Sequence, residues 1–86
     1  MHENNKIQAG FIILTEGGDV HDRPTYRVAV QPENIISIAA RSGWSRCNAK
    51  VYMKNGGDID TIETFDEIMK LIEEYNKQCK ANSNYE

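Results

Sequence analysis

The sequence predicts an α+β fold, namely an antiparallel five-stranded β-meander, strongly curved, with one C-terminal α-helix packed on it. Short segments rich in β-branched and aromatic residues alternate with turn residues over most of the chain. Apolar residues then recur at helical spacing near the C-terminus. With 86 residues there is room for one hydrophobic core. We therefore expect a single domain over residues 10–80, between a flexible lead (1–9) and a flexible tail (81–86).

The predicted strands follow one another with turn chemistry between them. They cover residues 11–15, 25–31, 35–40, 49–54 and 58–63. Pro32 has no amide donor, so it ends the second strand, and one helical turn is expected around it. Asn55 and Gly56 both tolerate positive φ, which is typical of a tight hairpin between the last two strands.

The helix is predicted over residues 65–79. Thr64 and Glu67 have the spacing of a capping box, in which the hydroxyl and the carboxylate each accept a bond from an orphan amide. An apolar stripe is expected to face the sheet; its members are Phe65, Ile68, Met69, Leu71, Ile72, Tyr75 and Cys79. One helix cannot cover both faces of five strands. Either the sheet curls, or its open face meets another subunit.

The composition is that of an ordinary soluble globular protein, with 40% hydrophobic and 27% charged residues. The longest apolar run, residues 11–14, is too short to span a bilayer, and the polar N-terminus lacks the apolar core of a signal peptide. We therefore expect a cytoplasmic protein with no membrane segment. Cys47 and Cys79 belong to no metal or redox motif, so both are expected to be free thiols.

Charge is distributed unevenly, which concerns partners rather than fold. Residues 23–54 carry six basic and one acidic side chain, whereas residues 55–86 carry eight acidic and three basic ones. The candidate binding residues lie in the basic part: Arg27, Arg41, Trp44, Arg46 and Lys50. A Trp beside Arg residues is typical of a protein-interface hot spot, and the same set could stack a base and contact phosphate. Alternatively, Trp44 folds back onto the sheet edge and the arginines are solvated.

The remaining polar clusters predict neither catalysis nor a metal site. Asp19, His21 and Asp22 are too close in sequence to converge on one ion, so a solvated loop is expected. Asp58 and Asp60 fall on one side of a strand, where they could bind a cation or a basic partner, or keep a charged edge from stacking. No nucleophile lies beside a base in the sequence. We predict no catalytic residue, no metal and no cofactor, and hence no enzyme.

The order of these signals resembles the FlbD-type flagellar and swarming-motility accessory proteins. The motifs that carry the resemblance are Ile12-Ile13-Leu14-Thr15, Ile35-Ile36-Ser37-Ile38, Asn55-Gly56 and the helix start at residues 60–68. The resemblance implies a non-enzymatic accessory role. Similar small proteins are carried by phages and mobile elements, which extends the expectation to a phage accessory protein or an inhibitor of a host system.

The leading functional hypothesis is a protein–protein interaction module that docks on another protein or on a copy of itself. The uncovered sheet face motivates it, and the basic and acidic parts of the chain could meet across a homo-oligomer. The alternative is binding of nucleic acid or a small anionic nucleotide through the basic Arg/Trp loop. A net charge of −3 disfavours tight binding to duplex DNA, because such binding depends on neutralising phosphates.

Overall fold

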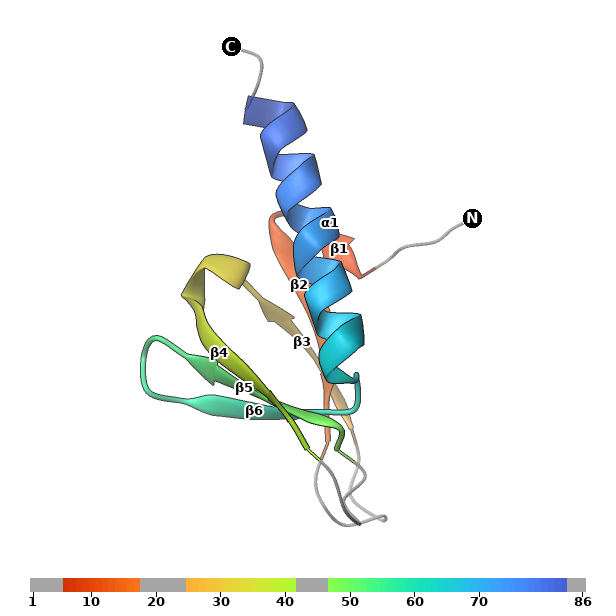
Figure 1. Ribbon diagram of the computed structural model, residues 1–86, viewed down its shortest axis with the longest axis vertical. Helices are drawn as coiled ribbons and strands as arrows, with labels where there is room; N and C mark the ends of the chain where they lie inside the picture. Colours follow the sequence, from red (N-terminus) through yellow and green to blue (C-terminus); the bar gives the residue numbers. More distant parts are fainter. Residues whose placement is uncertain (1–5, 18–24, 42–46, 84–86) are drawn as a thin grey trace.

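The computed structural model describes residues 6–17, 25–41 and 47–83, with side chains as far as residue 78 (Figure 1). The strands are β1 (Ile7–Gln8), β2 (Phe11–Glu16), β3 (Tyr26–Val30), β4 (Ile35–Ala40), β5 (Ala49–Met53) and β6 (Asp58–Thr61). A 3₁₀ turn, η1 (Pro32–Asn34), precedes β4, and the helix α1 (Phe65–Ser83) follows β6. The predicted α+β class, with an antiparallel sheet and one C-terminal helix, is confirmed.

Within the described ranges the sheet has six strands, one more than the five predicted. The additional strand, β1, lies inside the predicted flexible lead and pairs with β2. Ala9 and Gly10 connect the two strands with φ values of 54° and 85°, as in a type I′ hairpin. An alanine at the first turn position gave no turn signal in the sequence. The predicted strong curvature is not confirmed, because the sheet stays open.

The sheet consists of two parts that meet at one corner. Its order is β1-β2-β6-β5-β4, with β3 on the other edge of β2. The pair Glu16–Thr61 is the register contact recorded between β2 and β6, so β1–β2–β3 and β4–β5–β6 join there, and Figure 1 shows them spreading apart from this corner. A Cβ on Gly17 would lie 2.9 Å from Ile62 Cδ1, so glycine permits the close approach at the corner.

Local signals set most element boundaries correctly. The Asn55-Gly56 turn forms, with Gly56 at φ 94° and the Met53 amide donating to the Gly57 carbonyl at 2.9 Å. The capping box also forms: the Thr64 amide donates to Glu67 Oε1 at 2.9 Å, and the Glu67 amide donates to Thr64 Oγ1 at 3.1 Å. The helix begins at Phe65 as predicted and continues past residue 79 to Ser83.

The core lies between the sheet and one face of α1, which packs against β2 and also contacts β4. Its buried members are Ile12, Leu14, Val30, Ala49, Val51, Ile68, Leu71 and Tyr75. The predicted helix stripe is partly wrong, because Phe65 and Met69 are 36% and 45% exposed. The apolar arc of this helix is wider than the strip that the sheet can cover, and Leu71 rather than Met69 belongs to the buried side.

Candidate binding surface

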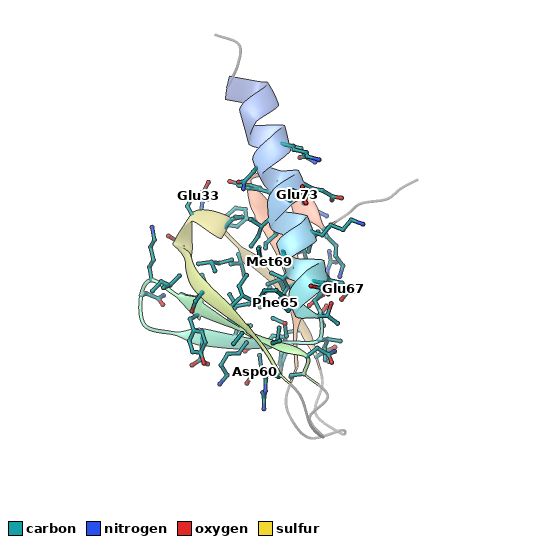
Figure 2. All side chains as sticks on the ribbon, viewed as in Figure 1. Glu33, Asp60, Phe65, Glu67, Met69 and Glu73 are labelled. Atoms are coloured by element: carbon teal, nitrogen blue, oxygen red, sulfur yellow. The ribbon has the colours of Figure 1, made fainter. Side chains whose placement is uncertain are left out.

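Charged side chains gather on the face of β4–β5–β6 that points away from the core. The β5–β6 register sets Lys50 opposite Asp60 and Tyr52 opposite Asp58. Side chains alternate along a strand, and Ala49 and Val51 are buried, so these four residues share the outer face. Figure 2 shows Asp60 on the side of the strands away from α1.

Arg41 and Lys50 converge on Asp60 from two different segments. The Arg41 guanidinium lies 2.9 Å from Asp60 Oδ1, and Lys50 Nζ lies 3.7 Å from the same oxygen. All three side chains are about 30% exposed, at 29%, 30% and 30%. We call Arg41, Lys50 and Asp60 the outer-face cluster. Two cations share one carboxylate here, so the cluster keeps an excess of positive charge.

Arg41 of the outer-face cluster directly precedes residues 42–46, which include Trp44, one of the predicted binding residues. The Arg41 amide donates to the Asn48 carbonyl at 2.9 Å, and the Asn48 amide donates to the Thr61 carbonyl at 2.8 Å. These bonds join Arg41 to Asn48 and hold Asn48 against β6. Trp44 and Arg46 themselves lie outside the described residues, as do Asp19, His21 and Asp22.

The structure brings together two of the five predicted binding residues, Arg41 and Lys50. Arg27 is exposed on β3, opposite Thr15, and β2 and β6 lie between β3 and β5 in the sheet. Asp60 had been considered for a cation or a basic partner, and its Oδ1 already meets two cations of its own chain. Among the described residues, no group of three or more His, Cys, Asp or Glu could hold a metal ion.

A buried carboxylate at the sheet corner was missed by the sequence analysis. Glu63 is 5% exposed. Its Oε1 accepts the Thr15 amide at 2.8 Å, and its Oε2 accepts the Thr15 hydroxyl at 2.9 Å and Lys6 Nζ at 2.8 Å. The Ile13 amide bonds to Lys6 and the Thr15 carbonyl bonds to Ile62, so the Thr15 amide falls in the gap between β1 and β6. The Glu63 carboxylate fills that gap in the ladder.

The surroundings of Glu63 keep it ionised. Burial acts to raise the pKa of Glu63, but the hydrogen bonds from Lys6 and Thr15 outweigh burial and hold the pKa below its ordinary value. An ionised, fully engaged carboxylate acts as a structural acceptor and is unsuited to be a proton carrier near neutral pH. No sequence signal marks this role, because it depends on where β1 and β6 end along β2.

Among the described residues, Cys47 takes part in no disulfide. It is 2% exposed, and its Sγ lies 3.2 Å from the Gly17 carbonyl oxygen, to which it donates. A buried thiol that packs at the sheet corner is inaccessible to a substrate. The side chain of Cys79 lies outside the described part of the structure.

A groove of about 430 Å³ opens between β3 and the β5–β6 hairpin. Its lining includes the apolar residues Phe11, Val28, Val30, Met53 and Ile59, and the polar residues Gln31, Asn34, Asn55 and Asp58. Asp58 also lies on the outer face beside Tyr52, so the groove borders that face. This mixture of apolar and polar lining residues suits a peptide ligand, whose apolar side chain would contact the former and whose backbone would contact the latter.

Comparisons with protein-family models, with curated proteins and with solved structures found no match to this chain. The resemblance to FlbD-type accessory proteins therefore stays a prediction that rests on the sequence motifs. No helix in the described part of the chain is long and apolar enough to cross a membrane. The function must be inferred from the surface of the molecule itself.

Proposed function

We propose that this protein is a non-enzymatic protein–protein interaction module, and that the outer face of β4–β5–β6 binds the partner. The observation that carries the proposal is the convergence of Arg41 and Lys50 on Asp60, on the face opposite the helix. Tyr52, on the same face, is 40% exposed. Arg and Tyr are enriched in protein interfaces, where they supply large contact areas and several donors.

The outer-face cluster favours a protein partner over a phosphate. Two cations and one carboxylate give the cluster a net charge of +1, which balances one partner carboxylate but not the several charges of a nucleotide phosphate chain. A partner with an isolated acidic side chain can instead bind one donor of Arg41 while Lys50 keeps Asp60 neutralised. We expect that partner segment to carry one Asp or Glu next to an apolar residue, which would pack on Tyr52.

Glu63 supports the non-enzymatic part of the proposal. It is the buried carboxylate of the described chain, and its oxygens are engaged by Lys6 and Thr15 within the sheet corner. A general base needs a free lone pair aimed at a substrate and a pKa near the working pH. The lowered pKa and the engaged oxygens of Glu63 fit a structural role.

A library of random peptides panned on the immobilised protein tests the proposal. We expect enrichment of sequences with an acidic residue beside an apolar one. The affinity of the best peptide should fall at least about ten-fold in the double variant Arg41→Ala/Tyr52→Ala, which corresponds to roughly 1.4 kcal/mol. Arg27→Ala, which removes an exposed arginine from β3, is the matched control and should leave the affinity unchanged.

Equal affinity of the double variant and the wild type would disprove the assignment of this face, provided that both unfold at the same temperature. Failure to enrich any peptide would remove the support for a linear partner segment and with it the proposal as stated. Circular dichroism on both variants separates loss of binding from loss of fold.

The alternative function, binding of nucleic acid or a small anionic nucleotide, rests on the same two cations. Asp60→Asn distinguishes the two, because removing the central carboxylate should strengthen phosphate binding by Arg41 and Lys50. Titration of the variant with ATP and with a single-stranded oligonucleotide at low salt gives the answer. Binding that appears in Asp60→Asn and disappears with Arg41→Ala would favour the alternative.

A phage accessory or inhibitory role and a cytoplasmic location stay predictions from the sequence.

A further inference from the structure

One flank of α1 carries a row of exposed apolar side chains. Phe65 is 36% exposed and Met69 is 45% exposed, and Ile72 is partly exposed. With Asn76 they recur at steps of four, three and four residues, which is the spacing of a coiled-coil seam. We call these four residues the helix seam. Figure 2 shows Phe65 and Met69 one above the other along the helix.

The helix seam runs beside the buried stripe of the same helix, and Ile72 belongs to the border, since it is partly exposed and also packs against the core. The stripe that packs on the sheet consists of Ile68, Leu71 and Tyr75. An open concavity of about 740 Å³ runs beside the helix seam. Its lining residues all belong to α1: Asp66, Met69, Lys70, Ile72, Glu73, Asn76 and Lys77. Because one helix supplies the whole lining, this hollow is shallow and open to solvent, and another element can lie along it.

The charges along this hollow alternate in sign. Asp66, Lys70, Glu73 and Lys77 follow one another at the same steps of four, three and four residues. Such spacing allows pairs within the helix, four residues apart. Within the described part of the chain, however, the ion pairs recorded join Lys6 to Glu63, and Arg41 and Lys50 to Asp60. The four charges along the hollow take no part in these pairs.

The order of the charges is self-complementary when the helix is reversed. In an antiparallel pair with its two-fold axis between Leu71 and Ile72, Asp66 of one copy meets Lys77 of the other, and Lys70 meets Glu73. A parallel pair in register would set each charge against its like. The sequence of signs thus favours a second copy of this chain, and it fixes the orientation of that copy.

We propose that two copies of the protein associate through the helix seam as an antiparallel, two-fold symmetric dimer. Ile72 and Met69 of both copies form the apolar centre, Phe65 of each copy lies at one end near Asn76 of the other copy, and the four alternating charges of each copy form the rim on one side. The seam is short, so the affinity is expected to be micromolar. This inference goes beyond the proposed function, because it concerns a different surface and a different partner.

A charge-swap experiment tests the dimer, with the mass measured by sedimentation equilibrium over roughly 5 to 500 µM, a range that brackets micromolar association. The wild type should shift from monomer to dimer over this range. Lys70→Glu and Glu73→Lys should each weaken self-association at least about ten-fold, because each sets like charges opposite one another. A mixture of the two variants should form the heterodimer, in which every facing pair is again of opposite sign.

Two further variants complete the test. Met69→Lys places a charge in the apolar centre and should leave the protein monomeric over the whole range. Lys54→Glu makes the same charge change as Lys70→Glu on an exposed residue beyond β5, so it should dimerise like the wild type. A wild type that stays monomeric throughout, or a mixture of Lys70→Glu and Glu73→Lys that forms no heterodimer, would overturn the inference. Peptide binding by the outer face is measured separately, so either result can fail alone.

Discussion

Two carboxylates at the end of β6, Asp60 and Glu63, each meet a lysine of the same chain, yet their surroundings differ. Asp60 is half-buried on the outer face and shares one oxygen between Arg41 and Lys50. Glu63 is buried at the sheet corner, where the main chain and hydroxyl of Thr15 occupy both its oxygens. Hydrogen bonding to a part-buried backbone amide makes Glu63 part of the fold, whereas Asp60 and its two cations lie on a surface that a partner can reach.

The largest effect expected from this comparison is that of Glu63→Ala. The change leaves the part-buried Thr15 amide and hydroxyl without their acceptor, and each such loss costs up to about 1–3 kcal/mol. We expect the free energy of unfolding to fall by roughly 2–4 kcal/mol. Urea unfolding followed by circular dichroism measures the loss. A loss below about 0.5 kcal/mol, the range of ordinary surface changes, would show that water replaces the carboxylate and that the corner does not depend on it.

The pH dependence of stability should reveal the same residue. The pKa of Glu63 in the folded protein lies below its ordinary value of 4.5, so the unfolded chain takes up a proton first as the pH falls. The stabilisation by ionised Glu63 is therefore complete above about pH 5.5 and is lost as the pH falls through the folded pKa. The difference in unfolding free energy between the wild type and Glu63→Gln should be full at neutral pH and narrow below pH 4.5. If the difference in unfolding free energy stays constant down to the lowest pH at which the protein folds, the lowered pKa of Glu63 is contradicted.

An intermediate effect is expected at the corner from Gly17→Ala. The new Cβ would lie 2.9 Å from Ile62 Cδ1, which is the far end of a side chain and can move. Overpacking of this kind costs about 1–3 kcal/mol, and we expect the lower end because Ile62 is partly exposed. Gly57→Ala, on the exposed hairpin, meets the Asn55 side chain at 3.2 Å and serves as the matched control. Equal losses in the two variants would mean that the corner is not tightly packed.

The contrast between the two carboxylates also marks what the sequence can predict. Thr64 with Glu67 and Asn55 with Gly56 are local signals, since each needs a few neighbouring residues, and both gave the correct boundaries. The Lys50–Asp60 pairing follows from the hairpin register, so it can be predicted from the position of the Asn55-Gly56 turn. The role of Glu63 cannot be predicted in this way, because it depends on a gap between two strands that are distant in sequence.

The orientation of α1 was unpredictable for a related reason. The sequence shows an apolar arc but not how much of it the sheet will cover, so Met69 was assigned to the core together with Ile68. The width of the sheet part under the helix decides this, and it depends on how the strands, distant in sequence, are arranged. Exposed apolar residues on an otherwise well-packed helix are therefore informative about partners, since the fold leaves them without an internal role.

The smallest effect is expected from Asp60→Asn, and it completes the comparison. A half-exposed ion pair is worth about 0–1 kcal/mol and is screened by salt, so the free energy of unfolding should change by less than about 0.5 kcal/mol. Urea unfolding at low and at high salt measures this change, with Glu63→Gln as the reference. If Asp60→Asn destabilises the protein more than Glu63→Gln does, the outer-face cluster holds the β4–β5–β6 part together. In that case Arg41 and Lys50 are committed to the fold, and the partner must bind elsewhere.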